Sequence, residues 1–320
     1  MQLSEKLPKV DKYPSYLNLY KSGELRKRVT EAYKILADCI LCPRVCKVDR
    51  VHGEQGFCRA GHLPTVSSYN PHHGEEPPLS GSRGSGTIFF TYCTMKCIYC
   101  QNYPISQLDE GRDVSLEELA RMMLTLQRRG CHNINFVTPS HFVPQILAAL
   151  EIAIEGGLNI PLVYNTGGYD LLKTLKLMDG VVDIYLPDAR YSDPKTAFKY
   201  SSAHNYPAIN RAALKEMHRQ VGDLVMDENG IAKRGLIIRH LVLPQSLAAT
   251  RETLHFIATE ISPKTYISLM DQYFPAYQAC ENPPLDRRIT AAEYKEAIRI
   301  MEEEGLERGW KQLHIGLWEF

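Results

Sequence analysis

Three cysteines have the types and spacing for redox chemistry. Cys93, Cys97 and Cys100 follow an apolar stretch in the run TIFFTYCTMKCIYCQNYP, residues 87–104, with C-x3-C-x2-C spacing. Three thiolates at the end of a predicted strand can hold an iron–sulfur cluster and leave one iron without a protein ligand. The alternative is an ordinary zinc site, of which C-x2-C is a common half. The extra C-x3-C step and Tyr99 before the third cysteine favour the cluster.

A second cysteine group precedes the first. Cys39, Cys42, Cys46 and Cys58 have C-x2-C-x3-C-x11-C spacing in a short segment rich in glycine and proline. Four thiolates suit a closed site for either tetrahedral zinc or an auxiliary iron–sulfur cluster, and spacing does not separate these. Such a segment has little core of its own and needs a metal to fold.

Composition sets limits on the class of protein. Lys plus Arg and Asp plus Glu number 37 each in 320 residues, so the bulk charge gives no reason to expect nucleic acid or an anionic membrane as partner. No apolar stretch is long enough to span a bilayer, and MQLSEKLPKVDKYPSY at the start lacks the apolar core of a signal peptide. We therefore expect a cytoplasmic protein that makes no membrane contact.

The elements that must position the first cysteine group alternate between strand and helix. A helix is expected over 15–37, and a loop or linker over the Gly, Pro and Ser-rich residues 61–86. About six strand–helix repeats after residue 87 predict an α/β fold, an open or partial TIM-type (β/α)6 barrel over 81–320, with a small cysteine-rich N-terminal segment over 1–80. The later strands are expected in the runs NINFVT (133–138), PLVYNT (161–166), VVDIYLP (181–187), LIIRHLVL (236–243) and TYISLM (265–270).

The three-cysteine motif with its aromatic residue resembles the signature of the radical S-adenosylmethionine (SAM) superfamily. The resemblance implies a 4Fe–4S cluster whose open iron binds SAM, and cleavage of SAM by one electron to a 5′-deoxyadenosyl radical that abstracts hydrogen. It also implies a partial barrel. The wider run GSGTIFFTYCTMKCIYCQN, with RHLVLP at 239–244 and MDQYFP at 270–275, is similar to a branch of iron–sulfur proteins related to the pyruvate formate-lyase activating enzyme. A related N-terminal cysteine cluster occurs in that branch, which supports metal ligation there.

Polar residues at the strand ends are the candidate SAM contacts, because ligands of such barrels bind at the carboxyl ends of the strands. The second strand ends at 138–141, where relatives carry a Gly-Gly-Glu segment for the SAM amino group; here Ser140 or backbone carbonyls would take that contact. Asn165 begins a polar-glycine segment similar to the one that holds the SAM ribose. The candidate cofactor contacts are Tyr99, Ser140, Asn165, Asp188, Arg190 and Arg239.

Two of these candidates carry further expectations. Asp188-Ala189-Arg190 resembles an Asp-x-Lys arrangement with arginine in place of lysine, and a guanidinium suits positioning of a carboxylate better than proton transfer. Arg239 and His240 are adjacent on one strand, so only one of them points into the barrel. Tyr273 is a candidate for substrate contact or radical relay, against a packed position at the rim, and Glu75 and Glu76 are candidate contributors to the mouth of the site.

The resemblance implies a low-potential electron donor of the flavodoxin or ferredoxin type. The substrate is either a glycyl-radical protein or a small molecule or peptide modified directly. A non-catalytic iron–sulfur protein that transfers electrons or mediates an interaction is the alternative of a different class. Nucleic-acid modification ranks lower, since the charge is balanced and no basic tract is present.

Overall fold

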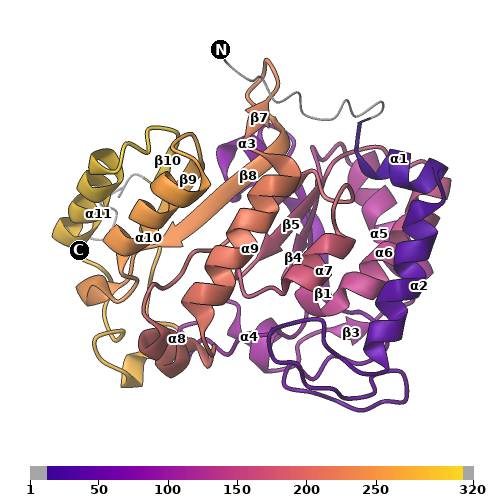
Figure 1. The fold of residues 1–320 in the computed structure, drawn as a ribbon, viewed down its shortest axis with the longest axis horizontal. Coiled ribbons are helices and arrows are strands. Elements are labelled where there is room, and N and C mark those ends of the chain that lie inside the picture. The colour runs from indigo at the N-terminus through magenta and orange to yellow at the C-terminus, as the bar shows by residue number, and fades with distance from the viewer. Residues whose placement is uncertain (1–12, 313–320) are drawn as a thin grey trace.

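The computed structural model describes residues 13–312, so the start of the predicted N-terminal segment, residues 1–12, lies outside the described residues. One mostly parallel sheet runs through the molecule in the order β10-β9-β8-β6-β5-β4-β2-β1-β3, with β7 paired to β8 (Figure 1). The strands are β1 (Thr65–His72), β2 (Ser85–Phe90), β3 (Arg112–Asp113), β4 (Ile134–Val137), β5 (Leu162–Thr166), β6 (Ile184–Pro187), β7 (Val225–Met226), β8 (Ala232–Leu241), β9 (Tyr266–Met270) and β10 (Gly309–Lys311).

The six strands β2, β4, β5, β6, β8 and β9 are parallel neighbours, β10 adds a further parallel strand, and β1 and β3 are antiparallel. The order ends at β3 and β10, so within the described residues the sheet is open. This confirms the predicted partial (β/α)6 barrel, including the five later strands.

Helices cover the outer face of the sheet (Figure 1). Two of the longer ones, α5 and α11, begin with capping boxes at Ser115 and Thr290, each paired with a glutamate three residues later. The helices are α1 (Tyr16–Lys21), α2 (Glu24–Leu36), α3 (Pro77–Ser80), α4 (Tyr103–Gln107), α5 (Leu116–Arg128), α6 (Val143–Glu155), α7 (Leu172–Leu177), α8 (Pro194–Ser201), α9 (Tyr206–Val221), α10 (Thr250–Phe256) and α11 (Ala291–Glu303). A π-helical turn, Ile257–Ile261, continues α10.

Two predictions need correction. The helix expected over 15–37 is two helices, because Gly23 adopts a left-handed φ of 73° between α1 and α2. Residues 61–86 are not a linker: β1 pairs antiparallel with β2, and α3 follows it. The sheet therefore begins before the expected boundary at residue 80. β1 is a strand because its backbone pairs with β2 and not because its sequence has an alternating apolar pattern, since β1 is largely exposed on both faces.

Alternation of side chains divides the core into two parts. Ile88, Phe90 and Phe136 face outward and pack under the helices, in the larger apolar cluster. Inward-facing residues of four strands, Val163, Ile184, Ile237 and Tyr266, pack with Leu79 of α3 in a smaller cluster. The segment around α3 follows the end of β1, which pairs with the start of β2. It therefore fills the amino end of the barrel and leaves the carboxyl end for ligands.

Candidate active site

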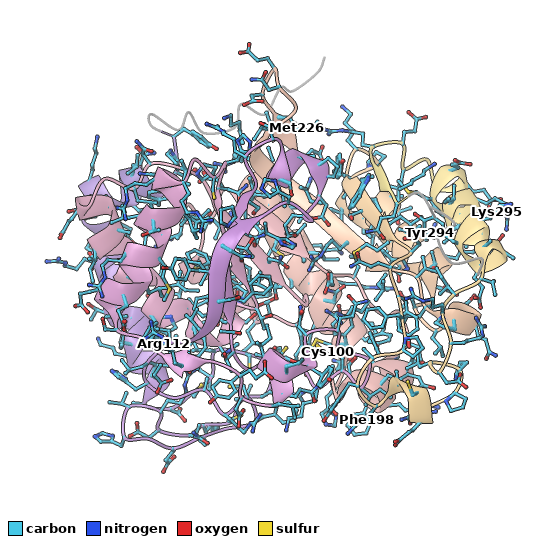
Figure 2. All side chains as sticks on the ribbon, turned by 180° about the vertical axis from the view of Figure 1, so that it is seen from behind. Cys100, Arg112, Phe198, Met226, Tyr294 and Lys295 are labelled. Atoms are coloured by element: carbon cyan, nitrogen blue, oxygen red, sulfur yellow. The ribbon has the colours of Figure 1, made fainter. Side chains whose placement is uncertain are left out.

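The cysteine loop begins directly after β2, at the carboxyl end of the parallel strands. Tyr92 has a left-handed φ of 74°, which turns the chain into the loop. Each sulfur has a polar neighbour: the Met95 N–H donates to Cys93 Sγ at 3.4 Å, Arg190 Nη1 donates to Cys97 Sγ at 3.5 Å, and the Ser106 hydroxyl lies 3.2 Å from Cys100 Sγ. Figure 2 shows Cys100 at this edge of the barrel. Donors of this kind stabilise thiolates, so the loop fits a cluster held by three cysteines.

The thiols of the loop are not acidic by themselves. Burial raises the pKa of Cys93 to about 12, and the neighbouring Cys97 adds to the rise. Burial likewise raises the pKa of Cys100, again with Cys97 as the next cause. Because cysteines ligate as thiolates, a bound metal must supply the positive charge that replaces their protons.

Asp188 joins two arginines, of which Arg190 also contacts Cys97. Its carboxylate accepts hydrogen bonds from Arg190 Nη2 at 2.5 Å and from Arg239 Nε at 2.8 Å, and only 6% of its side chain is exposed. Burial alone would raise the pKa of Asp188, but Arg239 and Arg190 outweigh it and the pKa is lowered. Arg239 Nη2 also donates to Asn165 Oδ1 at 2.7 Å. The ends of β5, β6 and β8 are thereby connected by one buried polar network.

Glu75 extends this network into the barrel. Its Oε2 lies 3.8 Å from Arg239 Nη1, and 9% of its side chain is exposed. Burial, followed by the repulsion of Glu76, raises the pKa of Glu75 to about 7. Glu76 is buried as well. Neither glutamate lines the cavities, and Glu75 meets the site only through Arg239, because the segment between β1 and α3 enters the barrel from its amino end.

Two adjoining cavities, of about 150 and 100 Å3, lie over the network. Cys100, Asp188, Arg190 and Arg239 line both. The structure brings together the three loop cysteines and five of the six candidate contacts, namely Tyr99, Asn165, Asp188, Arg190 and Arg239.

Ser140, the sixth candidate, does not line either cavity. Its hydroxyl donates to Asp170 Oδ1 at 2.5 Å and is buried. Thr138 lines the smaller cavity at the same strand end, with a left-handed φ of 59°. No local pattern predicted the contact between Asp170 and Ser140, because the two residues lie on different loops.

The structure shows which of the two adjacent residues on β8 faces the cavity. Arg239 points inward, whereas His240 is fully buried on the outer side, where its ring contacts the Ala189 carbonyl at 2.7 Å and the Thr250 hydroxyl at 3.0 Å. Burial lowers the pKa of His240 to about 4, so it is neutral at physiological pH.

Two tyrosines near the cavities are held by their hydroxyls. The Tyr99 hydroxyl lies 2.5 Å from that of Tyr191, so its ring rather than its hydroxyl is available to a ligand. Tyr273 is 1% exposed, donates to the Leu285 carbonyl at 2.6 Å and packs edge-on against Tyr99. Tyr273 is therefore a packed residue at the rim.

Several residues of the site were not anticipated. Ser106 of α4 reaches Cys100, and Met95 lines the smaller cavity. Leu241 and Met270 line the larger one and supply its apolar surface. Leu241 and Met270 are each two positions beyond an inward-facing polar residue, Arg239 and Ser268, so strand alternation could have identified them.

The sequence profile described as "Radical SAM superfamily" matches residues 87–257, from the first apolar strand to the end of α10. This chain belongs to the radical SAM superfamily. As a radical SAM protein it is an enzyme that uses a 4Fe–4S cluster and SAM. The residues present fit that cluster, since three thiols with hydrogen-bond donors at each sulfur face the cavities. Within residues 13–312 no helix has the length and apolarity needed to cross a membrane.

Comparison with curated proteins gives a relative in Methanocaldococcus jannaschii, named as uncharacterized protein MJ0674, that is 31% identical over 298 residues and covers 91% of this chain and 82% of the relative. Similar solved structures include TYW1 with a lysine-pyruvate adduct bound (10% identity, TM-score 0.44, 68% of this chain and 73% of that one). They also include HydG, a maturase of the FeFe hydrogenase (13%, 0.47, 70% and 50%), and methylornithine synthase PylB (15%, 0.44, 68% and 62%). The assignment to the radical SAM superfamily rests on the profile.

The four N-terminal cysteines lie together in the segment between α2 and β1, at the lower edge of the view in Figure 1. Burial raises the pKa of Cys42, with the neighbouring Cys58, Cys39 and Cys46 thiols as further causes. Within the described residues no three Cys, His, Asp or Glu side chains are placed to hold a single metal ion.

Proposed function

We propose that this radical SAM enzyme holds its cluster through Cys93, Cys97 and Cys100 and cleaves SAM reductively in the adjoining cavities. The observation that carries the proposal is that all three thiols and the Asp188–arginine network line the same cavity, the smaller of the two. The cluster supplies one electron to SAM, and the resulting 5′-deoxyadenosyl radical abstracts hydrogen from the substrate.

The residues of the cavities have separate roles in binding SAM. Arg190 Nε is buried and has no hydrogen-bond partner among the described residues, which supports a contact with the SAM carboxylate. Asn165 lies at the polar-glycine segment and would contact the ribose, and Thr138 replaces Ser140 as the side-chain candidate for the amino group. The ring of Tyr99 supplies an apolar surface for the adenine. Asp188 and Arg239 orient these groups.

Holding the reactants together is what the chain itself contributes. Asp188 fixes the direction of both guanidiniums before SAM binds, so less conformational freedom is lost on binding. Arginine has no proton to give at neutral pH, and this favours electrostatic positioning over acid–base catalysis.

We further propose that the substrate is a protein in which the enzyme installs a glycyl radical, with reducing equivalents from a flavodoxin or ferredoxin type donor. The sequence similarity to the activating-enzyme branch supports this class. A stable protein-centred EPR signal should appear when the reduced enzyme, SAM and the correct partner are mixed. Hydrogen abstraction from a small molecule without such a signal would favour a small-molecule substrate instead.

The cluster assignment is tested by 5′-deoxyadenosine and methionine production in anaerobically reconstituted protein with dithionite. Replacing Cys93, Cys97 and Cys100 by alanine should abolish both products, because no iron would remain to bind SAM. Cys280→Ala is the matched control, since this exposed cysteine lies outside the cavities. Equal product yields from the triple variant and the control would overturn the assignment.

A further inference from the structure

We propose that Cys39, Cys42, Cys46 and Cys58 hold a second iron–sulfur cluster, which adjoins the catalytic cysteine loop and delivers electrons to it. The proposed metal site is supported by contacts around the four cysteines and does not depend on the function proposed above. Its role in electron delivery rests on the function proposed above.

The segment around the four sulfurs is built like a ligand site. The Phe57 N–H donates to Cys46 Sγ at 3.4 Å. A side chain at Gly56 would meet Cys46 Sγ at 2.8 Å, so only glycine allows this approach of the backbone to the sulfur. Amide groups directed at sulfurs are typical of bound thiolates rather than of free thiols.

Arg50 indicates that negative charge belongs at this site. It is 1% exposed, and its guanidinium donates to the carbonyls of Gly61 at 2.7 and 3.1 Å and of His141 at 2.8 Å. Within the described residues it forms no ion pair with a carboxylate, and Nη1 lies 3.9 Å from Cys39 Sγ. A buried cation without a counter-ion is costly. Four thiolates carry four negative charges, which is more than the positive charge of a divalent ion or of an oxidised cluster core. The occupied site would therefore be a net anion and would supply the missing counter-ion.

The place of the four cysteines favours a cluster over zinc. Four thiolates can bind either, but zinc has no redox chemistry, whereas an iron–sulfur cluster accepts an electron and passes it on. A second redox centre has a role beside the catalytic cysteine loop that zinc does not have there.

The two cysteine groups are in direct contact through residues next to the cysteines. Arg44, between Cys42 and Cys46, donates from Nε to the Thr94 carbonyl at 2.8 Å, and Thr94 follows Cys93. The Arg59 guanidinium, next to Cys58, lies 5.5 Å from the ring centre of Tyr92, next to Cys93.

A third contact joins the same two cysteine groups. The Phe57 ring has the Arg44 guanidinium 3.6 Å from its centre and Lys96 Nζ 4.7 Å from it. Phe57 and Lys96 immediately precede Cys58 and Cys97. Three contacts thus connect the ligand loops without an intervening element.

The outer surface of the segment is open to a donor. Val45, next to Cys46, and Val51 are 42% and 41% exposed, although the four cysteines themselves are buried or half-buried, as the catalytic cysteines are. A low-potential donor of the flavodoxin or ferredoxin class gives one electron to the second cluster, which passes it to the catalytic cluster. That electron enters the C5′–S bond of SAM, which breaks to methionine and the 5′-deoxyadenosyl radical. Electrons balance at each transfer, and no proton is needed.

The test uses two full-length proteins, the wild type and a catalytic-loop variant with Cys93→Ala, Cys97→Ala and Cys100→Ala. Because the N-terminal segment is intact in both, misfolding of its own variants cannot obscure the result. After anaerobic reconstitution with iron, sulfide and zinc present, metal and sulfide are measured. We expect about eight irons per wild-type chain and about four in the variant, with only trace zinc. Zinc at about one per chain, with little iron in the variant, would overturn the second cluster.

Electron delivery is tested on the same variant by rapid mixing with reduced flavodoxin, followed by EPR. Appearance of a reduced-cluster signal is expected, since only the N-terminal cluster remains to accept the electron. In the fully reduced wild type the signals of two adjacent clusters should broaden each other. A loaded cluster that stays oxidised with flavodoxin would overturn the role in delivery.

The experiments distinguish a failure of the proposed SAM cleavage from a failure of the proposed second cluster. Wild-type protein that carries about eight irons but makes no 5′-deoxyadenosine with dithionite would contradict the proposed SAM cleavage and leave the second cluster standing.

Discussion

Asp188→Asn should destabilise the enzyme strongly, because it leaves two guanidiniums without their counter-ion. The carboxylate receives hydrogen bonds from Arg190 and Arg239 and is 6% exposed, whereas the two guanidinium side chains are 26% and 19% exposed. Breaking a buried pair by removing one partner costs about 3 to 5 kcal/mol. With an unfolding entropy of about 2.1 cal/mol/K per residue, this lowers the Tm of a chain of this length by about 4 to 7 °C.

The assay is thermal denaturation of the anaerobically reconstituted protein, followed by circular dichroism at one scan rate. Asp193→Asn is the matched control. Asp193 is the half-buried N-cap of α8, and asparagine caps a helix as well as aspartate does, so the Tm of this variant should stay within about 1 °C of the wild type. Adding Arg239→Gln to Asp188→Asn should recover part of the loss, because one of the stranded charges is removed.

If Asp188→Asn lowers the Tm by less than about 1 °C, the reasoning is refuted, because solvent or the remaining carboxylates would then neutralise both arginines. A strictly additive double variant would also contradict it. The substituted enzyme should in addition lose the SAM-dependent change in the cluster EPR signal, because Arg190 would no longer be held toward the cavity.

Two further predictions concern the barrel interior and the cysteine loop. Because burial and Glu76 raise the pKa of Glu75 from 4.5 to about 7, the folded protein binds more protons than the unfolded chain between these pH values. Stability should then fall as pH rises from 4.5 to 7, by up to about 1.4 kcal/mol per pH unit, and Glu75→Gln should flatten this part of the profile; an unchanged slope in urea denaturation would contradict the assignment. Tyr99→Phe should cost about 1 kcal/mol, because Tyr191 keeps Ser201 as a partner at 2.8 Å, and should leave the SAM-dependent EPR change intact. Loss of that change would show that the hydroxyl, and not the ring, meets SAM.

The periodicity of the chain was sufficient to predict the barrel. Strands such as 161–166 and 265–270 are short apolar runs between helical patterns, and local sequence determines such elements because burial on both faces of a parallel strand requires apolar residues. β1 was missed because its side chains are largely exposed and it is a strand through its pairing with β2. The helix break at Gly23 was missed because the apolar period continues across it.

The sequence by itself determined the chemistry of this protein, since the spacing of Cys93, Cys97 and Cys100 and the strand before them indicate an open iron without reference to the rest of the fold. The sequence also limited the candidate SAM contacts to residues at the ends of the strands. Only the tertiary structure decided that Arg239 rather than His240 faces the cavity, because alternation requires that one points inward but register with β6 and β9 selects which. It likewise brought Glu75 to Arg239 and the N-terminal cysteines to the catalytic loop. These contacts join segments far apart in the chain, so they depend on packing that no local pattern records.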